Sequence, residues 1–418
     1  MDHREFLLGL FDAAVSAARA PGLLTRALPA SRGRPARVIG AGKAAAAMAA
    51  VLDRCWDGPL EGVVVTPYGH GLAAGRIEVL EAAHPLPDAA ALAAGQRMLG
   101  IAQAAQAGEL VICLLSGGAS ALLCVPPPGI TLAMKAGLGR QLLASGADIA
   151  AINTVRRHLS LVKGGRLAAA AFPADLLCLA VSDVPGDDPA VIGSGPTVAD
   201  PTTRADAAAV LRRWRIEAPA ALWRWLENPA AESVKPGDPR LGRAQFRLVA
   251  TPATALAAAA RRARALGVRP VLLGSALAGE ARALGRAHAA LALAHARRGG
   301  RCVLLSGGET TVTVRGPGRG GRNTEYLLAL FEALAGAPRI AALAADTDGI
   351  DGSADSAGAF FDPAARVEAA ARGLAPGPFL AANDSHAFFA TLGTVLHTGP
   401  TRTNVNDFRA ILVDAVPR

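Results

Sequence analysis

The sequence predicts a protein of two α/β domains, and three observations lead to that fold class. The chain of 418 residues is too long for one ordinary core, and 51% of it is apolar. Short runs rich in leucine and β-branched residues alternate with alanine-rich stretches, a pattern typical of parallel strands covered by helices. The alternation breaks between Trp214 and Arg240, in a tryptophan-rich helix followed by a polar stretch with many turn residues. We therefore predict one domain over residues 1–236 and a smaller one over 244–418, with a return of the last residues to the first domain left open.

Eight apolar runs have the length and composition of buried strands. They cover residues 37–39, 62–65, 109–115, 176–181, 246–250, 270–273, 302–305 and 340–345. In parallel sheets, ligands bind beyond the carboxyl ends of the strands. The residues that follow each run are therefore the candidates for chemistry.

The composition excludes several classes of function. The chain has a formal charge of +9, but only 4% of its residues are aromatic. Proteins that bind nucleic-acid strands usually combine a basic groove with stacking aromatic side chains, so we expect small anionic ligands and no nucleic acid. The five cysteines are odd in number and lack CxxC spacing, which indicates reduced thiols in the cytoplasm. We find no cleavable leader and no apolar run long enough for a bilayer, so neither export nor a membrane partner is expected.

Lysine is scarce in this chain. Only four of the 43 basic residues are lysines, at positions 43, 135, 163 and 235. Wherever any cation would serve, this composition supplies arginine, so a retained lysine indicates a specific role. Lys43 and Lys163 both lie beside glycines.

The segment Gly40-Ala41-Gly42-Lys43 follows the first predicted strand and precedes an alanine-rich helix. Small residues there let backbone N–H groups and the helix N-terminus approach a phosphate, and Lys43 adds a positive charge. The segment also matches the dinucleotide pattern GxGxxA, with Ala45 in the third position. However, Thr66-Pro67-Tyr68 after the next strand offers no carboxylate for a ribose. A tight strand-to-helix turn without a ligand is the structural alternative.

Two further segments of the first domain combine glycines with polar side chains. The segment Ser116-Gly117-Gly118-Ala119-Ser120 offers hydroxyls and amides for phosphate or carboxylate oxygens, although a plain turn explains it equally well. Residues 155–166 place His158, Lys163 and several arginines near the pair Gly164-Gly165. A solvated basic helix face is the simpler interpretation of this run, but such a helix does not need paired glycines.

Asp183 follows the predicted strand at residues 176–181. A carboxylate at the carboxyl end of a strand suits a Mg²⁺ ion whose other ligands are waters and substrate phosphates. The alternative is a turn whose aspartates cap backbone amides, which would account for Asp187 and Asp188 without a metal.

The second domain repeats part of the first. Leu-Leu-Ser-Gly-Gly at residues 114–118 recurs at residues 304–308, which predicts that Ser306, Gly307 and Gly308 form a second loop at a strand end.

Two more segments of that domain are candidates for ligand binding. The glycine-dense residues 316–321 precede Arg322 and a helix, and a flexible loop of this kind suits a role in closing on a ligand through Arg319 or Arg322. Residues 346–352 place Asp348 and Asp351 after a strand. An EF-hand is excluded, because Asp351 stands where that loop requires glycine.

Taken together, these motifs resemble the glycerate 2-kinases with a C-terminal MOFRL domain, a family whose members have long carried the label hydroxypyruvate reductase. The likeness covers nearly the whole chain. The matching segments are GAGKAAAAMA (40–49), LLSGGASALL (114–123), the run at 158–166, SDVPGDDPAVIGSGPT (182–197), LLSGGET (304–310), GGRNTE (320–325), DTDGIDG (346–352), NDSHAFF (383–389) and TGPTRTNVND (398–407). The last of these departs from the shorter TGTN form that the family more often has.

The resemblance implies a fold and a reaction. The fold is a doubly wound, Rossmann-like N-terminal domain with a smaller MOFRL-type α/β domain, and the active site lies in the cleft between them. The reaction is the ATP- and Mg²⁺-dependent phosphorylation of D-glycerate at its 2-hydroxyl, which gives 2-phosphoglycerate. ATP and D-glycerate would be the partners of a cytoplasmic monomer or homodimer. The alternative is an NAD(P)H-dependent hydroxypyruvate reductase, which the missing ribose carboxylate disfavours.

The motifs and the resemblance together name candidate residues. We expect Lys43, Arg322 and Asp183 to be catalytic, because phosphoryl transfer needs positioned cations and a group that takes the hydroxyl proton. Asp183, Asp348 and Asp351 are the candidates for Mg²⁺. The residues expected to bind substrate or phosphate are Gly40, Gly42, Ser116, Gly117, Gly118, Ser120, Lys163, Ser306, Gly307, Gly308 and Asn404.

Overall fold

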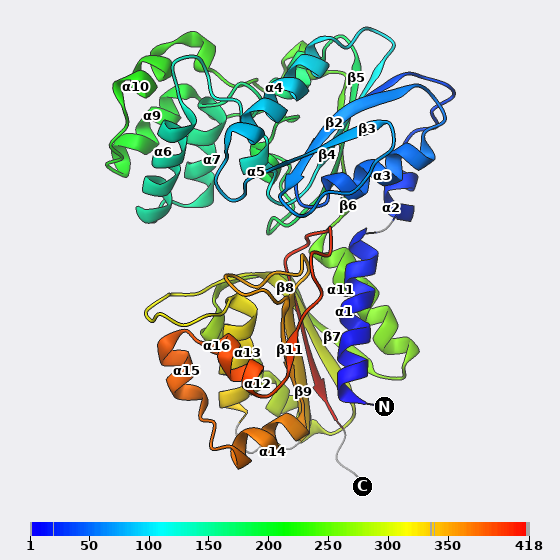
Figure 1. Ribbon diagram of the computed structural model, residues 1–418, viewed down its shortest axis with the longest axis vertical. Helices are drawn as coiled ribbons and strands as arrows, with labels where there is room; N and C mark the ends of the chain where they lie inside the picture. The colour runs from blue at the N-terminus through cyan, green and yellow to red at the C-terminus, as the bar shows by residue number, and fades with distance from the viewer. Residues whose placement is uncertain (1, 20, 335–336, 338, 415–418) are drawn as a thin grey trace. The chain divides into compact units, whose positions relative to one another are not determined.

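The computed structural model describes residues 2–19, 21–334, 337 and 339–414. They form two compact units, each built on its own six-stranded sheet. The first-sheet unit ends at Val249. The second-sheet unit combines helix α1 (His3–Arg19) with the chain from Ala250 onward (Figure 1). The predicted two-domain α/β fold is confirmed.

The first sheet has the strand order β3-β2-β1-β4-β5-β6, and β1 to β5 run parallel to one another. The order reverses between β1 and β4, so the sheet is doubly wound. All six residues of β4 are buried, as expected for a strand covered on both faces. The strands are β1 (Ala36–Ala41), β2 (Leu60–Pro67), β3 (Ile77–Ala82), β4 (Leu110–Leu115), β5 (Asp175–Val181) and β6 (Ala244–Ala250).

Helices cover both faces of the first sheet. Helices α4 (Ala89–Gln103) and α8 (Arg166–Ala171) pack their apolar side chains on the face of the sheet formed by Ile39, Val63 and Cys113. Helix α3 (Ala45–Cys55) lies on the opposite face and contacts β1, β2 and β4. The short elements of this unit are α2 (Pro21–Ala27), α5 (Ala119–Leu122), η1 (Ile192–Ser194), η2 (Pro229–Ala231) and η3 (Pro239–Leu241).

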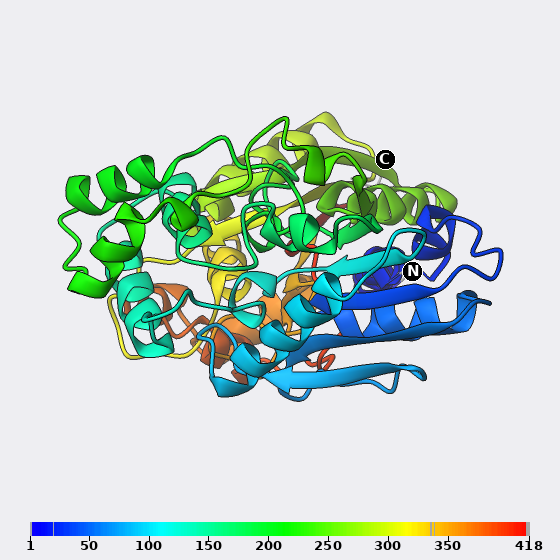
Figure 2. The ribbon, with the colours of Figure 1, turned by 90° about the horizontal axis from the view of Figure 1, so that it is seen from above.

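Four more helices of the first-sheet unit form a small group with a core of its own (Figure 2). Leucines of this core, such as Leu138 and Leu142 of α6, are buried against the neighbouring helices. The predicted tryptophan-rich helix is one of the four. They are α6 (Leu132–Ala144), α7 (Ile149–His158), α9 (Arg204–Arg213) and α10 (Ala220–Glu227).

The second sheet has the order β11-β10-β9-β12-β8-β7. Only β7 and β8 are parallel to each other, and every other neighbouring pair is antiparallel. The expectation of a parallel sheet is therefore wrong here, because β12 enters from the far end of the chain and runs between β8 and β9. The strands are β7 (Arg269–Glu280), β8 (Cys302–Thr311), β9 (Ile340–Asp346), β10 (Gly358–Phe361), β11 (Val395–Leu396) and β12 (Asp407–Val413).

Helix α1 packs beside α11 (Pro252–Ala265) on one face of the second sheet, and α12 (Ala281–Arg298) and α13 (Arg322–Ala333) cover the other face (Figure 1). The ring of Phe11 on α1 meets that of Phe408 on β12 edge-on, with centroids 5.9 Å apart. The remaining helices are α14 (Pro363–Ala371), α15 (Pro376–Ala382) and α16 (Ser385–Thr391).

The two units divide the chain near the predicted linker but differ from the prediction at the N-terminal helix. The start of the chain was expected to belong to the first domain, yet α1 buries its apolar face in the second-sheet unit. The last strand, β12, lies inside the second sheet and does not return to the first. An amphipathic helix fits the exposed face of either sheet, so hydrophobic pattern alone does not select between them.

One stretch among the described residues, His3–Ala27, is long and apolar enough to cross a membrane by length and composition alone. Its apolar side chains Phe6, Leu10 and Phe11 are buried within the second-sheet unit. A core helix of a folded domain meets the same criterion, so this stretch is weak evidence for a membrane span.

Candidate active site

The point where the strand order reverses lies between β1 and β4. In open α/β sheets, the loops at such a point diverge and leave a crevice beyond the carboxyl ends of the strands. The loop after β1 begins at Gly42, and the loop after β4 begins at Ser116. The segments predicted to bind phosphate in the first domain are therefore the two loops at the reversal point.

Hydrogen bonds join these two loops. The backbone N–H of Lys43 donates to the carbonyl of Gly117 at 2.8 Å, and the N–H of Ala44 donates to Oγ of Ser116 at 2.9 Å. Gly42 has a φ of +131°, and a Cβ there would lie 2.2 Å from Oγ of Ser116. Only glycine allows this close approach at position 42. The glycine and the two hydrogen bonds together fix the backbone of Lys43 against the loop after β4.

Gly118 gives Lys43 and His84 room to come near each other. It has a φ of +84° and is the N-cap of α5. A Cβ at this position would lie 3.0 Å from the imidazole of His84 and 3.7 Å from Cγ of Lys43. Gly40 has a different role, because a Cβ there would lie 2.6 Å from the carbonyl oxygen of Leu114 on the adjacent strand. Gly40 thus serves the packing of β1 against β4.

Ser120 and Lys163 connect to the turn at residues 193–195. The hydroxyls of Ser120 and Ser194 are 2.5 Å apart, and Ser194 donates to the side-chain oxygen of Asn153 at 3.0 Å. The ammonium group of Lys163 donates to the carbonyl of Gly193 at 3.1 Å. The paired glycines that follow Lys163 bond to the carbonyls of residues 194 and 195, so the 158–166 run is a folded loop rather than a solvated helix face.

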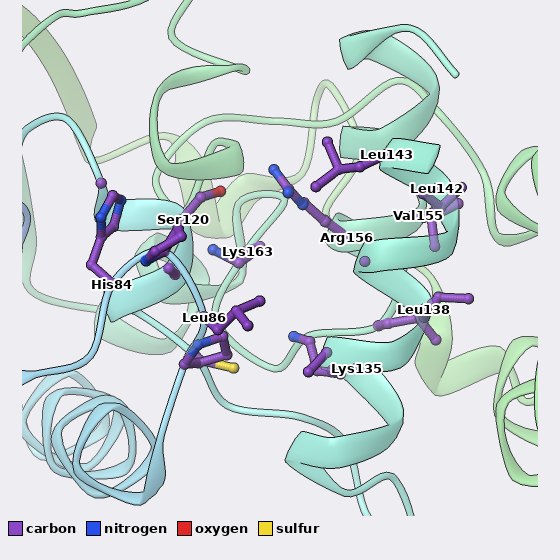
Figure 3. Close-up of a pocket in the computed structure, with 18 residues that line it drawn as sticks. His84, Leu86, Ser120, Lys135, Leu138, Leu142, Leu143, Val155, Arg156 and Lys163 are labelled. Atoms are coloured by element: carbon purple, nitrogen blue, oxygen red, sulfur yellow. The ribbon is translucent and has the colours of Figure 1, made fainter. Parts of the chain in front are cut away.

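A cavity of about 280 Å³ opens between α5, α6, α7 and the loop after β3 (Figure 3). Gly118, Ser120 and Lys163 line it, together with three residues that the sequence did not single out as binding residues: His84, Lys135 and Arg156. Burial, followed by the positive charge of Lys135, lowers the pKa of Lys163 to about 7. Burial also lowers the pKa of Lys135 and of Arg156. The cavity therefore concentrates positive charge in a space where water does not fully solvate it.

Asp183 is half-buried and lies just beyond β5, the neighbour of β4. The aspartates that follow it have turn roles. Oδ1 of Asp188 accepts from the N–H of Ala190 at 2.9 Å, and Asp187 has a φ of +56°. The capping interpretation thus explains Asp188, while Asp187 shares the turn through its backbone and Asp183 is the carboxylate two residues after the end of β5.

The second Ser-Gly-Gly segment is not a loop. Ser306, Gly307 and Gly308 lie within β8 and pair with Arg409, Phe408 and Asp407 of β12. Gly308 has a φ of +124°, and a Cβ there would lie 2.2 Å from the carbonyl oxygen of Leu277 on β7. The expectation of a loop at this position is wrong, because the glycines instead allow two strands to approach at an irregularity of the sheet.

Arg322 is the first residue of α13 and pairs with three carboxylates. Its Nε lies 2.6 Å from Asp407, its Nη2 2.7 Å from Asp346 and its Nη1 3.0 Å from Glu309. Burial alone would lower the pKa of this guanidinium, but the neighbouring carboxylates, Asp407 first among them, raise it above its ordinary value. One quarter of the side chain is exposed, and the three carboxylates fix the orientation of its guanidinium.

Asp351 and Asp348 are both buried, and their oxygens have protein partners. Asp351 accepts from the backbone N–H groups of Asn323 and Thr324, both at 2.9 Å, and so caps the N-terminus of α13. Burial raises the pKa of Asp351, while these hydrogen bonds oppose the rise. Oδ1 of Asp348 accepts from the N–H of Ile350 at 2.9 Å.

Asn404 is buried, and its side-chain oxygen accepts from the N–H of Asn406 at 3.0 Å. That contact is typical of a turn.

The acidic residues do not form a metal cage. Within residues 2–19, 21–334, 337 and 339–414, no group of three His, Cys, Asp or Glu side chains is arranged to hold a metal ion. Asp351 does not fit Mg²⁺, because both of its oxygens cap α13. A Mg²⁺ site with one protein carboxylate and substrate phosphates as further ligands is compatible with Asp183.

The predicted residues thus fall into two groups. The first-sheet unit brings together Lys43, Ser116, Gly117, Gly118, Ser120 and Lys163 at one edge of its sheet, with Asp183 beyond the next strand. The second-sheet unit places Arg322 at an acidic cluster that sequence reasoning had missed, Glu309, Asp346 and Asp407.

Similarity searches agree with this architecture. Residues 6–227 match the family described as "Domain of unknown function (DUF4147)", and residues 302–407 match the MOFRL family. A crystal structure titled glycerate kinase, from Thermotoga maritima, superimposes with a TM-score of 0.89 at 34% identity and covers 98% of this chain and 99% of its own. The chain belongs to the glycerate 2-kinase family with a C-terminal MOFRL domain.

Relatives within the family carry two kinds of name. A Pyrococcus horikoshii protein named glycerate 2-kinase is 37% identical, over 90% of this chain and 87% of its own. An Agrobacterium vitis protein, 49% identical over 98% of this chain and 94% of its own, has a provisional name as a hydroxypyruvate reductase. The reductase name is thus attached to a protein that shares the fold and the motifs of the kinases.

Proposed function

We propose that this protein is a kinase that phosphorylates D-glycerate at the 2-hydroxyl with ATP and releases 2-phosphoglycerate and ADP. The observation that carries the proposal is the pair of loops at the reversal point of the first sheet, where Gly117 and Ser116 hold the backbone of Lys43 and Ala44. A lysine fixed at that point beside backbone amides suits a phosphate. The family's named glycerate 2-kinases support the same activity.

In this reaction the 2-hydroxyl oxygen of glycerate forms a bond to the γ-phosphorus of ATP. The bond from that phosphorus to the oxygen bridging to the β-phosphate breaks, and ADP leaves with the electron pair. Such transfers depend mainly on positioning and on positive charge near the phosphoryl oxygens. We assign this stabilisation to Lys43 and to the amides of the Ser116–Gly118 loop in the first-sheet unit.

The proton of the attacking hydroxyl needs an acceptor, and we propose Asp183 for that role. Its place beyond β5 puts a carboxylate at the loop edge of the first sheet. The same carboxylate is our candidate for contact with Mg²⁺, an ion that would neutralise charge on the phosphate oxygens when bound. Asp183 cannot have both roles at the same time, because a carboxylate bound to the metal is a poor base.

Arg322 is our proposed cationic residue of the second-sheet unit. Its three carboxylate partners set its orientation, and its exposed edge remains available to an anion. An arginine preorganised in this way stabilises charge without rearranging during the reaction.

A coupled assay tests the proposed function. Purified protein with ATP, Mg²⁺ and D-glycerate should form ADP only when glycerate is present, and the product should be consumed directly by enolase, which accepts 2-phosphoglycerate but not the 3-isomer. Oxidation of NAD(P)H by hydroxypyruvate, without glycerate-dependent ADP formation, would overturn the kinase in favour of the reductase. We also propose that the enzyme works in the cytoplasm. We expect it to be a monomer or a homodimer, and sedimentation of the purified protein would test this oligomeric state.

A further inference from the structure

The cavity of the first-sheet unit is larger and less polar than a three-carbon acid requires. Its volume of about 280 Å³ corresponds to about nine water molecules at roughly 30 Å³ each. Aliphatic side chains from α6, from α7 and its C-terminal end, and from the loop after β3 line it, and those of α6 and α7 gather on one side (Figure 3). The aliphatic residues are Leu86, Leu138, Leu142, Leu143, Val155 and Leu159.

Three cations reach into the same cavity from separate elements. Lys135 comes from α6, Arg156 from α7, and Lys163 from the loop before α8. Their nitrogen ends turn toward the side of the cavity occupied by Ser120 and His84 (Figure 3). The cavity therefore has an apolar end and a cationic end.

The number of cations in the cavity indicates that its ligand carries several negative charges. Lys163 is 1% exposed, and its ammonium donates to a carbonyl oxygen. Burying a cation without an anion is costly, and three cations within one cavity repel one another. A single carboxylate would offset one of them, whereas a di- or triphosphate would offset all three.

We propose that this cavity is the nucleotide site, with the purine base among the leucines and the phosphates on Lys135, Arg156 and Lys163. The phosphate chain then points along Ser120 and Gly118 toward Lys43, whose backbone is tied to the same loop. The assignment rests on the proposed kinase function and adds to it which cavity takes ATP. Glycerate is a poorer match, because a three-carbon acid held at the cationic end would leave the space among the leucines unfilled.

Two glycines of α6 provide a matched pair of variants. Gly139 lines the cavity, whereas Gly137 lies on the same helix and does not, and a Cβ at either position meets no atom within 4 Å. Leucine also has a better helix propensity than glycine, so both Gly139→Leu and Gly137→Leu should fold. Only the former places new atoms in the cavity.

The experiment is a calorimetric titration of ADP into the purified protein without glycerate. Gly139→Leu should raise the dissociation constant for ADP at least about tenfold, while Gly137→Leu leaves it within about twofold of wild type. If ADP binds Gly139→Leu as tightly as wild type and only the KM for glycerate rises, the cavity holds the acid and the assignment is wrong. A different result would separate the two proposals. If wild type binds ADP and Gly139→Leu does not, but wild type shows no glycerate-dependent turnover, the nucleotide site stands and the proposed function is wrong.

A second measurement follows from the charges around Lys163. Burial, Lys135 on α6 and Arg156 on α7 lower the pKa of this ammonium to about 7, and Cys124 after α5 opposes the shift. Phosphates placed beside it would restore the proton. Titrations of ADP near pH 7.5 in buffers with different ionisation enthalpies should therefore show net proton uptake on binding, and the absence of uptake would overturn the contact between the phosphates and Lys163.

Discussion

The two Ser-Gly-Gly segments of this chain have the same residues and different structures. At residues 116–118 the segment leaves a parallel strand, and Gly118 begins a helix in a left-handed conformation. At residues 306–308 it continues inside β8, and Gly308 uses a positive φ to approach the backbone of β7. In the first case the glycine makes room for the side chains of Lys43 and His84, and in the second for another strand. The comparison teaches that a glycine motif acquires its role from what passes next to it.

The largest effect is expected from adding a methyl group at the second segment. Gly308→Ala would place a Cβ 2.2 Å from the backbone of Leu277 at a φ of +124°, which combines strain with overpacking, each worth about 1–3 kcal/mol. The second-sheet unit should lose most of its stability in urea-induced unfolding. Gly307→Ala is the control, because its Cβ would lie 3.1 Å from its nearest neighbour, and it should cost much less. A Gly308→Ala protein with normal stability but no activity would make this segment a ligand loop after all.

Arg322→Ala should come next in magnitude. The substitution leaves Asp407 and Asp346 buried without their cation, which should cost about 3 kcal/mol in free energy of unfolding in addition to activity. Arg322→Lys keeps the charge but cannot pair with three carboxylates at once, so it should recover stability more fully than kcat. Equal recovery of both would show that orientation is unimportant.

Lys43→Ala, beside the first Ser-Gly-Gly segment, should lower activity without lowering stability, in contrast to Gly308→Ala in the second segment. It removes the charge but not the backbone hydrogen bond to Gly117, so kcat should fall at least about 100-fold while the melting temperature stays near that of wild type. Steady-state kinetics and thermal unfolding on the same preparation measure both quantities. Turnover close to wild type would remove Lys43 from the catalytic residues and return its loop to a plain turn.

The smallest effect concerns pH. The folded pKa of Lys163, about 7, lies below the ordinary lysine value of about 10.4, so between these values the unfolded chain binds a proton that the folded chain lacks. Lys163 therefore makes stability rise with pH across that window. Lys163→Met should remove the contribution of this residue to the slope, and should therefore raise stability more at pH 7 than at pH 9. Unfolding curves at pH 7 and pH 9 test it, and an unchanged slope in the variant would contradict the lowered pKa.

The first sheet was largely predictable because β1, β2, β4 and β5 are short apolar runs with distinctive segments after them, whereas the edge strand β3 was missed because glutamates interrupt its apolar residues. Lys43, Ser116 and Lys163 were found from glycines at strand ends and from the scarcity of lysine. The same scarcity pointed to Lys135, which lines the cavity but has no adjacent glycine to mark it. His84 and Arg156 have no local signal, because only the packing of α7 and the loop after β3 brings them to this place.

The second sheet was harder to predict because its order depends on contacts between distant segments. Ser306 to Gly308 resembled a strand end, and only the pairing with β7 and β12 shows that the strand continues. Asp351 looked like a metal ligand by its neighbours in sequence, whereas its hydrogen bonds to α13 come from residues nearly thirty positions earlier. Hydrophobic periodicity contains no information on such register.

The placement of α1 has a consequence for how the protein is made. This helix is translated before the first-sheet unit, whereas β12, against which it packs, is translated after it. The first-sheet unit lies between them in the chain and contains all of its own strands, so it can fold during synthesis. The apolar face of α1 therefore stays unburied until the first-sheet unit and the strands of the second sheet have been translated.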